Sequence, residues 1–192
     1  MVNEIELKII ETARAIFIEE GYSGARMQKI ADVAEINKAL LHYYFRSKEK
    51  LYEEVVKNLI ADVASRLTLI FESDGTSSQK IELVVNMYFK MISRHPKLPL
   101  FIMNEIHENP DRFMIAVDQQ STKIQKIRMI LSVDASKGDY DGIHSLINLV
   151  GMSVFPFLAK PLLKKLFFGG EDESFNQFME SRPQKISQIL DI

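Results

Sequence analysis

MQKIADVAEINKALLHYYFRSK, residues 27–48, has the pattern of two short helices joined by a turn. In the first helix Ile30, Ala31 and Ala34 form a short apolar face, and the small alanines allow a second helix to cross closely at a steep angle. The apolar pattern then stops, and Asn37 is a favourable N-cap residue for the second helix. This stretch therefore predicts a helix-turn-helix.

The second helix of this stretch has two different sides. Leu41, Tyr44 and Phe45 fall on one side at spacings of three and four residues, which predicts that this side packs against neighbouring helices. The opposite side carries Lys38, Ala39, His42 and Tyr43. Because Lys, His and Tyr side chains can contact a phosphate or a base edge, the outward side is a candidate surface for binding DNA.

A longer pattern around this stretch resembles the N-terminal domain of the TetR family of bacterial transcriptional regulators. The resemblance extends from about Ile9 to Tyr52, about a quarter of the chain, and ends in the specific pattern YF-x-SKE-x-L. The residues that carry it are Ala13, Phe17, Gly21, Tyr22, Ile30, Ala31, Ala34, Leu41, Tyr44, Phe45, Ser47, Lys48, Glu49 and Leu51. The resemblance implies that the second helix of the motif is a recognition helix and that Tyr44 and Lys48 contact DNA.

Some positions depart from the family pattern. Met27 stands where the family usually has a Thr or Ser that contacts a phosphate, and Glu35 stands where a Gly is common. Leu40 and His42 stand where a Thr and a Tyr are frequent. Since Met27 and Leu40 cannot hydrogen-bond through their side chains, the family's phosphate contacts are not carried over to them, although Leu40 could touch a thymine methyl group. The DNA-binding residues that we predict are Gln28, Asn37, Lys38, Ala39, Leu40, His42, Tyr43, Tyr44 and Lys48.

The composition fits a protein with one local basic region. The chain has 192 residues, 46% of them hydrophobic, with a net charge of -2, which excludes a uniformly basic nucleic-acid coat protein. Residues 26–50 nevertheless carry six basic residues against three acidic ones. The absence of cysteine excludes disulfides, thiolate catalysis and Cys-ligated zinc. With no secretory signal, and with an apolar stretch at residues 146–159 that is interrupted by polar residues, we expect a cytoplasmic protein without a membrane span.

The whole chain has helical periodicity, and no segment has the pattern of a strand. We therefore expect an all-α fold of about nine helices: a three-helix helix-turn-helix domain in residues 1–47 and a helical bundle for effector binding and dimerisation in residues 48–192. The clearest loop is expected at residues 73–78. The helices are expected near residues 3–20, two within 27–48, then 47–71, 76–94, 95–108, 109–132, 140–168 (bent at Pro156 or Pro161) and 173–190 (broken at Pro183).

The C-terminal bundle is rich in Met and Phe, which either line an adaptable apolar cavity or fill an ordinary core. The resemblance implies a small, often apolar effector in this region. Asn104, His107 and His144 are candidates for polar contacts with it, and none is assigned. Glu105, His107 and Glu108 do not share a helix face, so we expect no metal site. No cofactor motif, phosphate loop or nucleophile elbow is present, and we do not expect an enzyme.

Residues 146–158 are apolar around nearly the whole helix circumference. Such a helix is covered either by a second copy of the chain or by the core of its own domain; the resemblance, in which the last two helices form a dimer, favours the homodimer. The sequence thus predicts a transcriptional regulator, a repressor released by a small apolar ligand, that binds a palindromic double-stranded operator. The alternative is a helical ligand-binding or adaptor protein that does not bind DNA. This alternative stays open because Met27 and Leu40 cannot make the family's phosphate contacts through their side chains.

Overall fold

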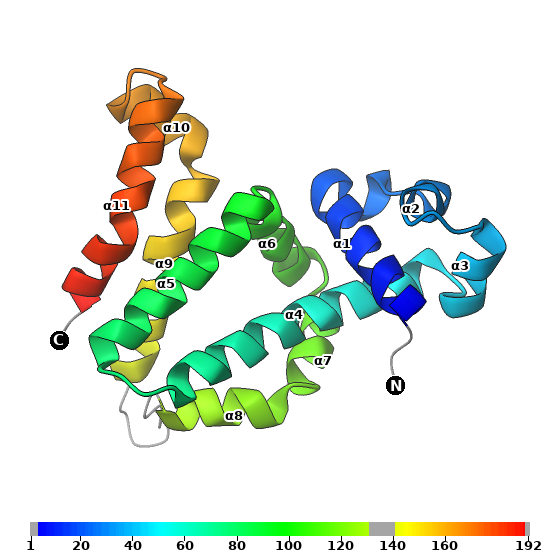
Figure 1. Ribbon diagram of the computed structural model, residues 1–192, viewed down its shortest axis with the longest axis horizontal. Helices are drawn as coiled ribbons and strands as arrows, with labels where there is room; N and C mark the ends of the chain where they lie inside the picture. Colours follow the sequence, from blue (N-terminus) through cyan, green and yellow to red (C-terminus); the bar gives the residue numbers. More distant parts are fainter. Residues whose placement is uncertain (1–3, 131–140, 191–192) are drawn as a thin grey trace. The chain divides into compact units, whose positions relative to one another are not determined.

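The structure is a computed structural model that describes residues 4–130 and 141–190. These residues form eleven helices and no strand, which confirms the all-α class (Figure 1). The helices are α1 (Glu4–Gly24), α2 (Met27–Val33), α3 (Lys38–Tyr44), α4 (Lys48–Glu72), α5 (Ser77–Arg94), α6 (Leu98–Glu108), α7 (Pro110–Asp118), α8 (Ser121–Ile130), α9 (Asp141–Leu158), α10 (Lys160–Phe167) and α11 (Asp172–Leu190).

The prediction of about nine helices was too low, because two expected long helices are each divided. The expected helix at 109–132 stops at Gln119, whose backbone N–H donates to carbonyls of the preceding turn, and α8 begins two residues later. The expected helix at 140–168 passes through Pro156 without ending and breaks at Ala159. Pro161 lies in the first turn of α10, where a missing N–H removes no helical hydrogen bond.

The ends of the helices agree with several local signals in the sequence. The side chain of Asn37 accepts a hydrogen bond from the backbone N–H of Leu40, as expected for an N-cap residue, and Thr76 and Gln79 form a capping box at the start of α5. The helix α11 continues through Pro183, so the predicted break there was wrong. The predicted helix end at Ser132 and the predicted helix start at Tyr140 lie outside the described residues.

The described residues pack into two compact units. The first contains the residues up to Val63 together with Leu100–Ser121, and the second contains Ala64–Pro99 together with the residues from Thr122 onward. The predicted boundary between residues 47 and 48 separates a part for DNA binding from a part for effector binding and dimerisation, and it stays a prediction.

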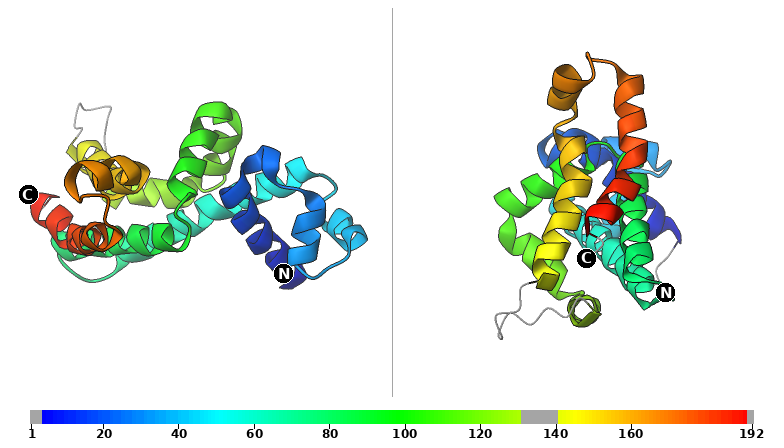
Figure 2. Two further views of the ribbon diagram at one scale, coloured as in Figure 1. Left: turned by 90° about the horizontal axis from the view of Figure 1, so that it is seen from above. Right: turned by 90° about the vertical axis from the view of Figure 1, so that its left-hand side faces the viewer.

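In the first unit, α2 packs against α1 and α3 around a core of fully buried side chains. This core includes Ile9, Ala13, Phe17, Ile30, Ala31, Ala34, Leu41 and Leu51. In the second unit α5, α9 and α11 lie side by side, as Figure 2 also shows, and they bury Val84, Leu149, Phe175 and Ile186. On α2 and α3 the buried Ile30, Ala31 and Leu41 are residues whose spacing predicted an inward face.

The second unit also leaves many large apolar side chains exposed. On α9, α10 and α11 these are Ile147, Phe155, Leu158, Leu162, Leu166, Phe167 and Ile189. None of the helices in residues 4–130 and 141–190 is by itself long and apolar enough to cross a membrane. The segments Ile143–Leu158 and Lys160–Phe167, bent by 75°, meet that requirement only when they are taken together.

Candidate nucleic-acid interface

The turn between α2 and α3 is built from a short set of backbone hydrogen bonds. The N–H of Ala34 donates to Ile30, and the N–H of Ile36 donates to Ala31 at 3.0 Å. Glu35 between them has a φ of 57°, in the left-handed region that favours glycine. Its exposed carboxylate accepts a hydrogen bond from Lys8 at 2.9 Å, which, with the charge of Lys8, lowers the pKa of Glu35. Glu35, which stands where the family pattern commonly has a glycine, therefore forms an ion pair with a residue 27 positions away in the chain.

The helix α3 has one buried side and one exposed side, as its spacing predicted. Leu41 and Phe45 are buried, whereas Tyr43 on the opposite side is 78% exposed. Tyr44 is half-buried, and its ring packs edge-on against Tyr43 at 5.4 Å between centroids. The short helix thus presents a continuous outward surface that can meet a partner.

All nine predicted DNA-binding side chains lie at least partly on the surface. Gln28, Asn37, Lys38, Ala39, His42 and Tyr43 are exposed, and Leu40, Tyr44 and Lys48 are half-buried. Some of them already make contacts within the chain: Gln28 donates to Asp32 at 2.8 Å, and Asn37 caps α3. Their accessibility permits contact with DNA, and their role in binding stays a prediction.

The first turn of α4 lies close to the end of α1. Ser47 accepts a hydrogen bond from the backbone N–H of Lys50 at 3.2 Å, as expected for a residue that caps this helix. The ammonium group of Lys48 lies 4.5 Å from the centre of the Tyr22 ring, a distance typical of a cation–π contact. Lys48 is therefore held at the start of α4 against an aromatic face instead of extending freely into solvent.

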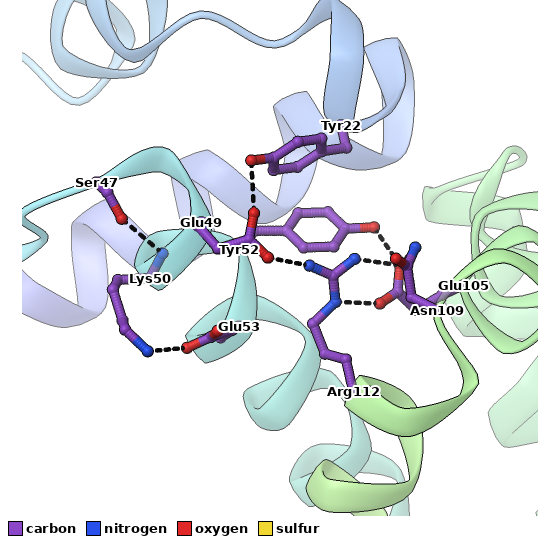
Figure 3. Close-up of polar contacts among 9 residues, drawn as sticks. All are labelled: Tyr22, Ser47, Glu49, Lys50, Tyr52, Glu53, Glu105, Asn109 and Arg112. Carbon is purple, nitrogen blue, oxygen red and sulfur yellow. Dashed lines mark hydrogen bonds and ion pairs between the residues drawn. The ribbon is translucent and has the colours of Figure 1, made fainter.

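A polar cluster joins α1, α4, α6 and α7 beside this turn (Figure 3). Arg112 donates through Nε to Glu105 at 2.6 Å and through Nη1 to Glu49 at 2.5 Å. The hydroxyl of Tyr52 donates to Glu105 at 2.6 Å, and the hydroxyl of Tyr22 donates to the other oxygen of Glu49 at 2.7 Å. One guanidinium group thereby links two carboxylates, and each carboxylate also accepts from a tyrosine.

Burial makes this cluster more than an ordinary surface ion pair. Glu105 is only 2% exposed, so its charge is separated from water and depends on the donors around it. Burial and the hydrogen bond to Glu105 raise the pKa of Tyr52 above its ordinary range, and the hydrogen bond to Glu49 raises the pKa of Tyr22. Both phenols therefore remain donors, and the cluster fixes the relative positions of its four helices.

Sequence reasoning missed this cluster. It considered Glu105 only with His107 and Glu108, but His107 and Glu108 are exposed while Glu105 points into the cluster. Within the part of the chain that the structure describes, no group of three or more His, Asp or Glu side chains is arranged to hold a metal ion. The available signal was that Glu105 follows the helical spacing of the apolar residue Phe101, which places its carboxylate on the buried side of α6. The candidate effector contacts Asn104, His107 and His144 are all exposed.

Comparisons with known proteins agree with the resemblance seen in the sequence. Residues 9–55 match the family model of bacterial regulatory proteins of the tetR family. The chain is 28% identical over 180 residues to IcaR, the negative transcriptional regulator of the biofilm operon icaADBC from Staphylococcus aureus strain Newman. This alignment covers 90% of this chain and 92% of IcaR.

Solved structures show the same fold. A tetR-family transcriptional regulator from Streptomyces coelicolor aligns with a TM-score of 0.68 and 17% identity, over 99% of this chain and 78% of the other. The fatty acid degradation regulator FadR from Bacillus halodurans aligns with a TM-score of 0.66 and 17% identity, over 95% and 96% of the two chains. At these identities the structural likeness concerns the fold alone.

Proposed function

Residues 9–55 form a domain of the tetR family of bacterial regulatory proteins, and we propose that the chain is a DNA-binding transcriptional regulator. The observation that carries the proposal is the exposed side of α3, which presents Lys38, His42 and Tyr43 opposite the buried Leu41. A regulator of transcription acts on the chromosome, so we place the protein in the cytoplasm. The relatives reported above are named as regulators, which supports a binding protein over an enzyme.

In this proposal α1–α3 are a three-helix helix-turn-helix domain, and α3 enters the major groove. Lys38 lies nearest the bases, and Leu40 contacts a thymine methyl group. Lys48 and the backbone N–H groups at the start of α4 bind one phosphate, because a helix N-terminus favours an anion. Gln28, Tyr43 and Tyr44 complete the contacts to the backbone and base edges.

The protein would bind DNA as a homodimer through α9 and α11. Support comes from the apolar side chains that a single chain leaves exposed there, including Phe155, which is 58% exposed. A face of this kind favours association with another copy. Two copies with one recognition helix each require a palindromic operator whose half-sites lie about one helical turn, 34–36 Å, apart.

The second part of the function would be release of DNA by a small apolar effector. Flexible and exposed Met103 and Met114, on α6 and α7, are side chains of the type that adapts to an apolar molecule. The effector would favour the conformation in which the two recognition helices no longer match successive grooves. IcaR is named as a negative regulator, which supports repression as the direction of control in this chain.

Selection of random duplexes with the full-length protein tests the DNA-binding proposal. The selected sequences should contain a palindrome, and their affinity should fall steeply with salt, by about 0.9 log units per log unit of salt for each phosphate neutralised. Lys38→Ala should change the preference at particular bases. If selection enriches nothing at low salt, and neither Lys38→Ala nor Lys48→Ala changes affinity for DNA, the proposal is wrong.

A thermal-shift screen tests the effector. Apolar compounds should raise the melting temperature by binding the folded state, and the same compounds should release DNA. Stabilisation by nucleotides or divalent metals alone would contradict an apolar effector.

A further inference from the structure

The position of Arg112 gives it two carboxylate partners of different character. Its Nε and Nη2 atoms face the buried Glu105, at 2.6 and 3.4 Å, while Nη1 faces Glu49, whose side chain is about half exposed. The planar, always charged guanidinium can serve two acceptors at once, which a lysine ammonium does less well. Arg112, from α7, therefore supplies the positive charge that forms an ion pair with Glu49.

Glu49 lies at a position where its negative charge would oppose the binding of a phosphate. It belongs to the first turn of α4, next to Lys48 in the chain. The nearby Lys50 does not compensate for it, because its ammonium group pairs with Glu53 at 2.7 Å. A free Glu49 carboxylate would repel a phosphate that approaches Lys48 and the N–H groups at the start of α4.

The cluster also connects Glu49 to the place where Lys48 rests. The second carboxylate oxygen of Glu49 accepts from the hydroxyl of Tyr22, and the ring of Tyr22 lies under the ammonium group of Lys48 at 4.5 Å (Figure 3 shows the first contact). The ring of Tyr22 further packs edge-on against Tyr52 at 4.9 Å. Arg112, Glu49, Tyr22 and Lys48 are thus consecutive members of one chain of contacts.

We propose that Arg112 is a positioning residue for DNA binding, which neutralises and holds Glu49 so that the start of α4 can accept a phosphate beside Lys48. The inference rests on the proposed function, since it assigns a role within the same DNA contact. It adds to that contact a residue from α7, outside the segment 9–55 that matches the family. A purely structural ion pair would instead affect folding and leave the affinity of the folded protein for DNA unchanged.

The test must separate repulsion of phosphate from damage to the fold, because Arg112→Gln alone leaves Glu105 buried without its cation. All variants therefore carry Glu105→Gln, which still accepts the hydrogen bond from Tyr52. To this parent are added Arg112→Gln, and then Arg112→Gln together with Glu49→Gln. The matched control is Lys126→Gln, which breaks an exposed ion pair with Glu72 in the second unit.

Binding is measured by fluorescence anisotropy with a random-sequence duplex of about 30 base pairs, since phosphate contacts do not depend on sequence. An unpaired like charge near a phosphate in water weakens binding about fivefold, so Arg112→Gln should weaken the parent about fivefold per bound subunit. Adding Glu49→Gln should restore affinity to within about twofold, and the loss should shrink as salt rises from about 50 to 200 mM because screening weakens the repulsion. Lys126→Gln should change nothing.

Weakening that Glu49→Gln fails to rescue would show that Arg112 acts through the fold and would overturn the proposal. Unchanged binding of the Arg112→Gln variant, or an equal loss in Lys126→Gln, would overturn it as well. If wild type and parent both fail to bind the duplex at low salt, the proposed function falls together with this inference. If the parent binds DNA but the Arg112 variants do not show the expected loss and rescue, the inference is refuted and the proposed function stands.

Discussion

Arg182 should stabilise the second unit by satisfying a carbonyl group that Pro156 leaves without a partner. In an uninterrupted helix the carbonyl of Met152 accepts from the N–H four residues later, but residue 156 is a proline and has no N–H. The Nη2 atom of Arg182, on α11, donates to this carbonyl at 2.9 Å. The hydrogen bond joins two helices of the predicted dimer region at the point where α9 is weakest.

The size of the effect follows from what Arg182→Met removes. A carbonyl left without its hydrogen bond costs about 1–2 kcal/mol, and the contact of the guanidinium with the ring of Phe178, at 5.7 Å, adds about 0.5–1 kcal/mol. Burial opposes this gain: it lowers the pKa of Arg182, and Nε has no hydrogen-bond partner among the described residues. Because these terms have opposite signs, the single substitution does not isolate the hydrogen bond.

A double-mutant cycle with Pro156→Ala isolates it. Alanine at position 156 restores the N–H, so the carbonyl of Met152 no longer needs Arg182, whereas the aromatic contact and the cost of burial are the same in both backgrounds. Arg182→Met should therefore cost about 1 kcal/mol less in the Pro156→Ala protein, measured by urea unfolding at one fixed protein concentration. A coupling free energy below about 0.5 kcal/mol, the limit of ordinary additivity, would refute the assignment.

Three further predictions concern other parts of the chain. Lys48→Ala should weaken binding to all duplexes and flatten the log–log salt dependence by about two units in a dimer, whereas an unchanged slope would exclude a phosphate contact. Phe155→Arg should convert a dimer into monomers or insoluble protein in light scattering, and a monomeric wild type at micromolar concentration would contradict the dimer. Since folding raises the pKa of Tyr52, the unfolded chain loses that proton first, and stability should fall as pH rises above about 10. Tyr52→Phe should make that loss less steep in urea titrations; an equally steep loss would be inconsistent with it.

The parts of the fold that depend on neighbours in sequence were predictable. A side chain that caps a helix bonds to a backbone N–H only three residues away, so Asn37 and Thr76 were recognisable from their positions alone. The buried side of α3 followed from helical spacing, because Leu41 and Phe45 must share a face. Similarly, the exposed side of α3 was predictable as the complement of this face.

The helix breaks were harder to predict, because they depend on how the chain packs. Two prolines in one apolar stretch gave opposite results: α9 continues through Pro156, whose missing hydrogen bond is replaced by Arg182, and α10 starts at the residue before Pro161. The sequence contains both prolines but does not show which of them finds a distant donor. The break at Gln119 has no proline or glycine to indicate it.

The polar cluster was unpredictable for a related reason, and it changes how the DNA-binding region is delimited. Glu49 and Arg112 are 63 positions apart, and only the fold brings them within hydrogen-bond distance.

Residues 9–55 carry the family pattern, yet the compact unit that contains them also includes residues 100–121. Glu49 and Tyr52 lie inside the matched segment and bond to side chains outside it. A boundary at residue 47 or 48 therefore separates the helices that we propose to contact DNA from part of the structure that fixes the first turn of α4. The geometry of that turn is set jointly by α4 and by α6 and α7, so substitutions far from residues 27–48 in sequence should alter the proposed contact of this turn with a phosphate.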